Sequence, residues 1–259
     1  MDGIMSKKFN KETETKIYGE NACLTLFKKR PEDIIQVFLT KEKLKSFAQI
    51  TKYCVQNKKA YHIVTRAELD QMTRATHHED ICMLVRKSTE RSLEEYLHGK
   101  PTQSLLIALE NVSNPHNIGA ILRSAAHFGA NGLILPEKKA ASAASAVRTS
   151  EGGAEFVEVY EASDFKKAMA LLKKNGYQIL TTSSHAKKSL YDLKWEKKVV
   201  ILFGEEADGL SKEALSYGET IKIPGTDKIE SLNVSVAAAV ILSDYYQKVK
   251  HHEVTPRFK

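Results

Sequence analysis

The fold is decided by the stretch VVILFGEEADGLS (199–211), in which an apolar strand runs into two carboxylates and then the start of a helix. Other short, nearly all-apolar segments alternate with stretches of helical character: LLIALE (105–110), GLILP (132–136), EFVEVY (155–160) and YQILTTS (177–183). Strands buried on both faces and separated by helices predict a parallel sheet with helices outside it. In such sheets, ligands bind beyond the carboxyl ends of the strands.

The first hundred residues predict a smaller α/β unit. We expect strands at 33–40, 61–64 and 81–85 and helices at 19–29, 41–56 and 66–74. Residues 89–103, with Gly99 and Pro101, have weak periodicity and many charges, which indicates a linker. The expected organisation is a leader (1–14), an N-terminal domain (15–88), the linker (89–103), a larger domain (104–250) and a basic tail (251–259).

Composition excludes several classes of protein. The chain has 259 residues, of which 42% are hydrophobic and 27% charged, so it can bury a core. No apolar run reaches the roughly 18 residues of a membrane span, and the first residues lack the apolar core of a secretory signal. The three cysteines are widely spaced, which favours neither disulfides nor a zinc site. We therefore expect a cytoplasmic protein without a metal.

The positive charge is concentrated in the first part of the chain. The formal net charge is +7; residues 1–100 hold 19 basic and 14 acidic residues, whereas residues 101–259 hold 20 and 18. A basic balance favours a polyanionic partner such as RNA. Runs of lysine are also common on solvated helix faces, so composition alone does not decide between an RNA-binding surface and a solvated one.

Polar residues follow the predicted strands of the larger domain in three segments. In NVSNPHNIGAILRS (111–124), Asn117 is the expected N-cap of a helix that carries Arg123. In FGEEADGLS (203–211), Gly204 and Gly209 bracket a turn, and Ser211 is the expected cap of the next helix. Taken singly, a solvated arginine or a tight turn explains each segment equally well.

The third segment is IPGTDKIESLNVSVAAA (223–239), in which a polar loop leads into an apolar helix. Ser231, Asn233 and Ser235 offer donors and acceptors at the start of this helix, or they merely cap it. The spacing in the second segment is not GxGxxG, so dinucleotide binding is not indicated.

Together, the order Asn117 to Arg123, then FGEEADGLS, then IPGTDKIESLNVSVA resembles the SpoU (TrmH-like) family of RNA ribose 2′-O-methyltransferases. The resemblance covers residues 105–250. Residues 15–88 resemble the family's RNA substrate-binding domain more loosely, because THHED (76–80) contains His78 but has Glu79 and Asp80 where members often have Gln-Gly.

The resemblance implies a SPOUT-type parallel sheet with a deep trefoil knot, S-adenosyl-L-methionine as cofactor, tRNA or rRNA as substrate, and a homodimer. Hydrophobic spacing alone does not predict a knot. The cofactor-binding residues that it implies are Leu202, Phe203, Gly204, Gly209, Ile223, Pro224, Leu232, Asn233 and Ala237. The catalytic residues that it implies are Asn117, Arg123, Glu206, Ser231 and Asn233.

An arginine is almost always protonated, so we expect Arg123 to bind a substrate phosphate and stabilise the forming alkoxide. Two alternatives stay open at this point. One is an RNA-binding protein that has the methyltransferase fold without its activity. The other is a base-directed methyltransferase of the wider SPOUT group. The sequence does not specify which RNA or which nucleotide is methylated.

Overall fold

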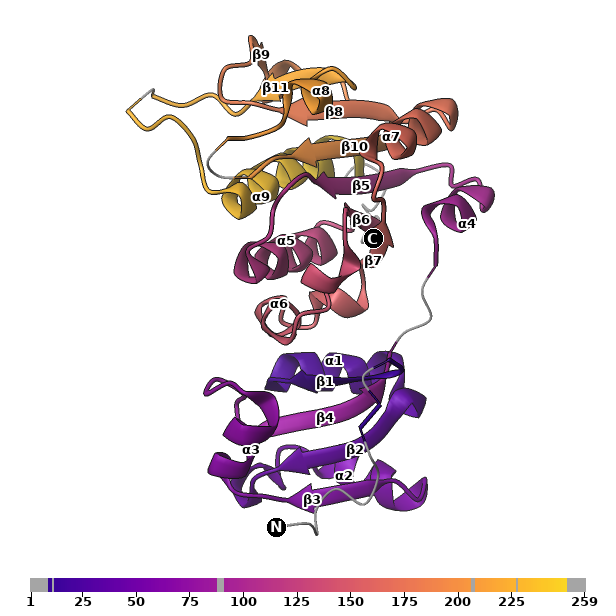
Figure 1. Ribbon diagram of the computed structural model, residues 1–259, viewed down its shortest axis with the longest axis vertical. Helices are drawn as coiled ribbons and strands as arrows, with labels where there is room; N and C mark the ends of the chain where they lie inside the picture. The colour runs from indigo at the N-terminus through magenta and orange to yellow at the C-terminus, as the bar shows by residue number, and fades with distance from the viewer. Residues whose placement is uncertain (1–8, 11, 88–90, 206–207, 227, 251–259) are drawn as a thin grey trace, which may run out of the picture. The chain divides into compact units, whose positions relative to one another are not determined.

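The computed structural model describes residues 9–10, 12–87, 91–205, 208–226 and 228–250. The chain divides into two compact units, with the boundary between Thr89 and Glu90. Each unit is built on its own sheet (Figure 1). The predicted basic tail (251–259) and most of the predicted leader lie outside the described residues.

The first unit is a four-stranded sheet with the order β1-β4-β2-β3. Its strands are β1 (Glu14–Tyr18), β2 (Ile34–Leu39), β3 (Ala60–Ile63) and β4 (Ile81–Arg86). Its helices are α1 (Glu20–Lys29), α2 (Ala48–Gln56) and α3 (Arg66–Thr73), with 3-10 turns η1 (Pro31–Asp33) and η2 (Lys41–Lys43). β2 and β3 are parallel, whereas β4 is antiparallel to both β1 and β2.

Two features of this unit differ from the sequence prediction. The strand β1 was not predicted, because ETKIY is largely polar and becomes a strand only by pairing with β4, Glu14 opposite Arg86. The single helix predicted over 41–56 is instead the turn η2 followed by α2. The chain bends between them, where Phe47 is buried and its N–H donates to the carbonyl of Lys43 at 3.0 Å.

The second unit contains a seven-stranded sheet with the order β7-β6-β5-β10-β8-β11-β9. All neighbouring strands run parallel, which confirms the sheet predicted from the apolar segments. The strands are β5 (Ser104–Leu109), β6 (Gly132–Leu135), β7 (Glu158–Glu161), β8 (Gln178–Thr182), β9 (Lys188–Ser189), β10 (Lys198–Phe203) and β11 (Glu219–Lys222). The central strand β10 is wholly apolar after Lys198 because it is covered on both faces.

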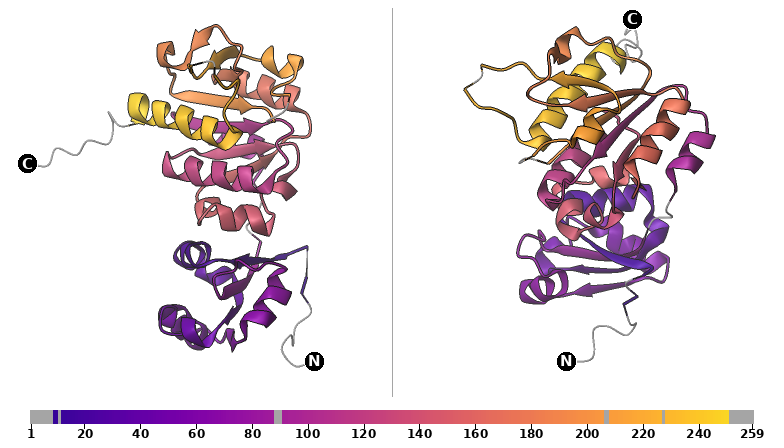
Figure 2. Two further views of the ribbon diagram at one scale, coloured as in Figure 1. Left: turned by 90° about the vertical axis from the view of Figure 1, so that its left-hand side faces the viewer. Right: turned by 45° about the horizontal axis from the view of Figure 1, so that its top comes forward.

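Helices cover both faces of this sheet (Figure 2). One layer contains α5 (Pro115–His127), α6 (Ala144–Thr149) and α9 (Val234–Tyr245), which pack on the side chains of Leu105, Ile107 and Ile201. The other contains α4 (Leu93–His98), α7 (Phe165–Lys174) and α8 (Lys212–Leu215), which pack on Leu106 and Val200. Short turns complete the unit: η3 (Lys138–Ala140), η4 (Gly153–Glu155), η5 (Leu190–Asp192) and the π-helix η6 (Tyr246–Lys250).

Two further boundaries differ from expectation. Within the predicted linker (89–103), α4 forms a helix because Ser92 and Glu95 cap each other's backbone N–H groups, and Leu93 and Leu97 are buried. The strand predicted at 155–160 begins later, because residues 153–155 form η4. The trefoil knot stays a prediction, since strand order and register do not describe how the chain is threaded.

In the part of the chain that the structure describes, no helix is long and apolar enough to cross a membrane. Nor do these residues include a cluster of three or more histidine, cysteine or acidic side chains that could hold a metal ion.

Candidate active site at the carboxyl edge of the parallel sheet

Three helices of the second unit begin near the carboxyl edge of its sheet. α5 follows β5, α8 follows β10, and α9 follows the loop after β11. Because these strands are parallel, their carboxyl ends lie along one edge, and their arrowheads point to the same side in Figure 1. The three sequence segments predicted to carry chemistry therefore share one edge of the sheet.

Asn117 and Asn233 meet at this edge, although 116 residues separate them. The Asn233 side-chain amide donates from Nδ2 to Asn117 Oδ1 at 3.2 Å. Asn233 also caps α9, because its Oδ1 accepts the N–H of Ser235 at 2.9 Å and that of Val236 at 3.4 Å. One side chain thus fixes the start of α9 and joins it to the first turn of α5.

The cap of α5 is a correction to the prediction. Asn114, not Asn117, is the N-cap, and its Oδ1 accepts the N–H of His116 at 2.9 Å. Pro115 occupies the first helical position, where a residue without an N–H is tolerated, so the helix starts three residues earlier than predicted. The Asn117 side chain is therefore not used as a cap and is available to contact Asn233.

Arg123 lies on the same helix as Asn117 but on another side of it. Two residues six positions apart on an α-helix lie about 120° apart around its axis. The Arg123 side chain is exposed. Its backbone is held by close packing, since a Cβ built on Gly153 would lie 3.0 Å from Arg123 Cα. The structure thus brings Asn117 and Asn233 together and places Arg123 on a separate, solvent-facing side of α5.

The glycine turn after β10 folds back tightly on itself. Glu205 and Gly209 form an isolated bridge, and the Gly209 N–H donates to the Glu205 carbonyl at 3.1 Å. A Cβ built on Gly204 would lie 2.0 Å from the carbonyl carbon of Gly209, so only glycine fits at position 204. Gly209 has φ of 67°, the left-handed region that favours glycine.

A carboxylate that the sequence analysis missed anchors this turn. Glu110, the first residue after β5, accepts the Ser211 N–H at Oε2 and the Ser211 hydroxyl at Oε1, both at 2.8 Å. Ser211 in turn caps α8, as predicted. The available sequence signal was a single carboxylate directly after a wholly buried strand, at the edge where ligands bind.

The predicted cofactor residues differ in what they can offer a ligand. The side chains of Leu202 and Phe203 are buried in the two core clusters, so only their main chain is near the edge. Ile223 and Ala237 are half-buried against the core, whereas Pro224, Ser231 and Leu232 are exposed. Glu206 lies outside the described residues.

Space is open beside the main chain at two glycines, one after β10 and one after β11. A Cβ built on Gly209 meets no described atom within 4 Å, and the same holds at Gly225. Leu232, with 49% of its surface exposed, offers an apolar side chain beside the asparagine pair. The asparagine pair itself is polar and uncharged, which suits a ligand bound by main-chain and amide hydrogen bonds.

In the first unit, His78 has a structural position. It is completely buried, its Nε2 lies 3.1 Å from Asp70 Oδ1, and its Nδ1 accepts the Asp80 N–H at 3.0 Å. The Glu79 carboxylate accepts the Glu20 N–H at 2.8 Å. Glu79 and Asp80 both have positive φ, so the segment 78–80 is a turn held by its own hydrogen bonds.

A doubly covered parallel sheet with polar groups at its carboxyl edge defines an α/β protein with a ligand site at that edge. Comparison with known families makes the assignment specific. Residues 104–243 match the SpoU rRNA methylase family, and residues 16–91 match the RNA 2′-O ribose methyltransferase substrate-binding family. The chain therefore belongs to the SpoU methylase family.

Individual relatives agree with this assignment. The chain is 34% identical over 257 residues to YfiF of Escherichia coli O157:H7, an uncharacterized tRNA/rRNA methyltransferase, and the match covers 96% of this chain and 74% of the relative. It is 36% identical over 243 residues to an uncharacterized tRNA/rRNA methyltransferase of Haemophilus influenzae, and that match covers 92% of this chain and 68% of the relative.

Solved structures share the fold. A crystal structure of an RNA 2′-O ribose methyltransferase matches with a TM-score of 0.77 and 23% identity, covering 91% of this chain and 89% of that one. An AdoMet-bound rRNA methyltransferase from Sinorhizobium meliloti matches with a TM-score of 0.72 and 19% identity, covering 92% and 88%.

Proposed function

We propose that this protein transfers a methyl group from S-adenosyl-L-methionine to the 2′-hydroxyl of a ribose in tRNA or rRNA. The observation that carries the proposal is the contact between Asn117 and Asn233 at the carboxyl edge of the sheet. It joins two of the three family motifs across 116 residues in a chain that belongs to the SpoU family.

The cofactor would be held mainly by main-chain groups. When bound, S-adenosyl-L-methionine supplies an electrophilic methyl group on a sulfonium. The turn from Gly204 to Gly209 would hold one part of it, and the main chain at Ile223 and Pro224 another. Leu232 and Ala237 would give apolar contact to its base. Leu202 and Phe203 would support the turn from the core, where their side chains are buried.

The remaining residues would act on the RNA. Asn117, Asn233 and Ser231 are uncharged hydrogen-bonding groups that would orient the ribose and its 2′-hydroxyl. Arg123 is exposed and stays protonated, so it would bind a substrate phosphate and lower the free energy of the forming alkoxide. We keep Glu206, which lies outside the described residues, as the fifth catalytic residue.

We propose that the first unit is the RNA substrate-binding domain and that the protein is a homodimer. α9 is apolar on nearly all sides, and such helices are normally buried. Val236 in its first turn is nevertheless 48% exposed. A second copy would cover this side chain. Because tRNA and rRNA are found in the cytoplasm, we expect the protein there.

Two measurements test the reaction. Titration calorimetry with S-adenosyl-L-methionine should give saturable binding to the full-length protein. RNA methylated by the protein should release 2′-O-methyl nucleosides in mass spectrometry, with the added mass on the ribose fragment. Absence of cofactor binding would favour the RNA-binding protein without activity, and added mass on the base fragment would favour the base-directed enzyme.

A further inference from the structure

The two ends of the first unit's sheet carry different charge. At one end, β2 and β3 begin, β4 finishes, and α1 finishes. We call this the basic end; its basic residues are Lys28, Lys29, Arg30, Lys58, Lys59, Arg86 and Lys87. Residues 12–14, 28–33, 58–60 and 86–87 together hold seven basic and four acidic residues. At the opposite end, Glu20 with residues 41–45 and 64–80 holds five basic and six acidic residues.

Two cations at the basic end, Arg86 and Lys59, are held partly by neutral groups. Arg86 Nη2 donates to the Glu32 carbonyl at 2.6 Å, and Lys59 Nζ donates to the same oxygen at 2.8 Å and to the Ile34 carbonyl. Asp33 receives ion pairs from Arg86 at 3.3 Å and Arg30 at 3.2 Å. Carbonyl oxygens orient a cation without cancelling its charge, so the basic end keeps an excess of positive charge around Asp33.

Burial lowers the pKa of the Lys59 ammonium, and the charge of Arg86 lowers it further. A nearby anion would oppose the effect of Arg86. The opposite end has no such surplus, because its ion pairs join full charges: Lys43 with Glu20, and Arg66 with Asp80 at 3.8 Å.

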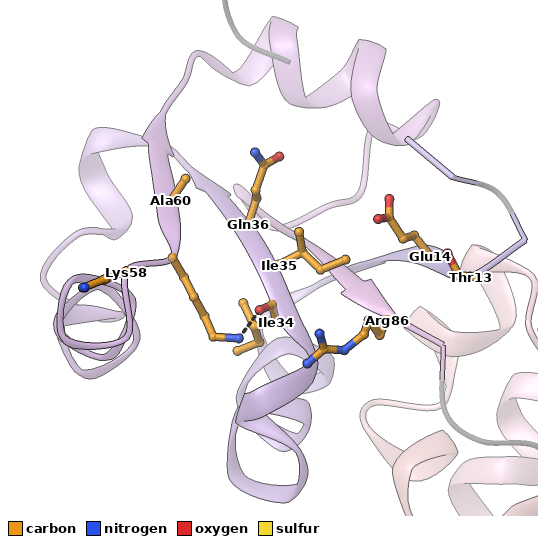
Figure 3. A pocket seen from close by; sticks show the side chains of 9 residues that line it. Thr13, Glu14, Ile34, Ile35, Gln36, Lys58, Ala60 and Arg86 are labelled. Atoms are coloured by element: carbon orange, nitrogen blue, oxygen red, sulfur yellow. Dashed lines mark hydrogen bonds between the residues drawn. The ribbon is translucent and has the colours of Figure 1, made fainter. Parts of the chain in front are cut away.

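A pocket of about 550 Å³ opens at the basic end, between the starts of β1, β2 and β3 (Figure 3). Ile34, Ile35 and Ala60 contribute apolar atoms to it, Gln36 an amide, Glu14 a carboxylate and Arg86 a guanidinium. Apolar atoms beside cations suit an unstacked nucleotide, whose base needs an apolar surface and whose phosphates need positive charge.

We propose that the basic end, rather than the end that carries His78, is the face of the first unit that binds RNA, with a single-stranded nucleotide in this pocket. The phosphates of that strand contact Lys28, Lys58 and Arg86. That the partner is RNA rests on the proposed function. The structure adds which face of the first unit binds the RNA and that the bound segment is single-stranded. Duplex RNA does not fit, because its bases are stacked away from such a pocket.

Matched charge substitutions in the full-length protein test the face. The variant K28Q/K58Q removes two exposed lysines from the basic end, and the control K41Q/K45Q removes two exposed lysines from the opposite end. Both change the net charge equally, so any long-range effect of charge is the same. Fluorescence anisotropy measures binding to a labelled 20-nucleotide oligouridylate and to unfractionated tRNA, and circular dichroism verifies that both variants are folded.

Each phosphate contact to a single strand contributes about 0.7 to the slope of log K against log salt. We therefore expect K28Q/K58Q to reduce that slope by about 1.4 and to weaken binding about tenfold at 0.15 M salt. The control should change binding less than twofold. Equal weakening by both variants, or greater weakening by the control, overturns the assignment of the face. Stronger competition by duplex than by single-stranded RNA overturns the assignment of the pocket.

The same variants separate this inference from the proposed function. A wild-type protein that binds RNA through the basic end but methylates no ribose refutes the reaction and leaves the inference intact. A protein that methylates ribose equally well with and without Lys28 and Lys58, at RNA concentrations below saturation, refutes the inference and leaves the reaction intact.

Discussion

The two roles of Asn233 can be separated by one substitution, Asn233→Asp. Aspartate keeps the oxygen that accepts the N–H groups of Ser235 and Val236, and it caps helices about as well as asparagine. Its charge at the start of α9 is favourable by about 0.3–1 kcal/mol. We therefore expect the free energy of unfolding to change by no more than about 1 kcal/mol.

The contact with Asn117 is lost in the same variant. A carboxylate oxygen replaces the N–H donor that lies 3.2 Å from Asn117 Oδ1, so two acceptors face each other. Either the Asn117 amide rotates or the pair separates, and both change the groups presented to the ribose. Loss of one preorganised donor at a reacting centre typically lowers kcat about 100- to 1,000-fold. We expect a loss of at least about 100-fold.

Asn233→Ala is the matched control, because it removes the cap as well as the contact. Loss of the cap costs about 1 kcal/mol, which lowers the Tm by about 2–4 °C. The assay combines thermal unfolding, calorimetry with S-adenosyl-L-methionine and single-turnover methylation. If Asn233→Asp is as active as the wild type, Asn233 is only a cap, and the reasoning from its contact with Asn117 is refuted.

Four further outcomes follow from the structure. Gly204→Ala places a Cβ 2.0 Å from the carbonyl carbon of Gly209, and overpacking of this kind costs about 1–3 kcal/mol. We expect the variant to have a Tm lower by several degrees and to show no cofactor binding in calorimetry. Unchanged cofactor affinity would contradict a role of the tight turn in binding. Glu110→Gln weakens the two hydrogen bonds from Ser211. If about 1 kcal/mol of their free energy is lost from cofactor binding, the cofactor Kd should rise about fivefold. The control Glu213→Gln should leave the Kd unchanged. Arg123→Ala should abolish methylation in a radiolabel assay and leave cofactor affinity intact; a parallel loss of both would refute its role toward phosphate. Burial raises the pKa of Cys82 to about 12, so its thiol should resist Ellman's reagent at pH 8 until the protein unfolds. The same thiol ionises near pH 9 in the unfolded chain but not in the folded one. The free energy of unfolding should therefore fall as the pH rises above about 9.

The apolar segments predicted the sheet of the second unit because its strands are buried on both faces. Burial on both faces forces nearly every position to be apolar, and no partner needs to be known to recognise such a strand. The glycine turn after β10 was likewise visible, since only glycine fits at position 204. The predicted cap at Ser211 was confirmed, because it depends on a hydroxyl and the backbone directly after it.

Features that depend on distant partners were missed. β1 is largely polar and exists because it pairs with β4 some seventy residues later, which no local pattern reveals. The α5 cap was misplaced because Asn117 and Asn114 have the same capping chemistry, and only the position of Pro115 decides between them. Glu110 was overlooked because its partner, Ser211, is 101 residues away.

The candidate active site also depends on partners that are distant in the sequence. That Asn117 and Asn233 meet was expected only from the resemblance to a family, and the sheet explains part of it: β5 and β11 run in the same direction within one sheet, so α5 and the loop that leads to α9 both start from the same edge. The described groups gathered there are amides, hydroxyls, main chain and the carboxylate of Glu110, and none of these is a cation. A site that receives a cationic methyl donor gains from such groups, since fixed positive charge would repel the sulfonium. Most of the positive charge available to RNA lies in the first hundred residues, and Arg123, the cation proposed to bind a phosphate in the second unit, is exposed on another side of α5 from Asn117, which keeps it apart from the asparagine pair.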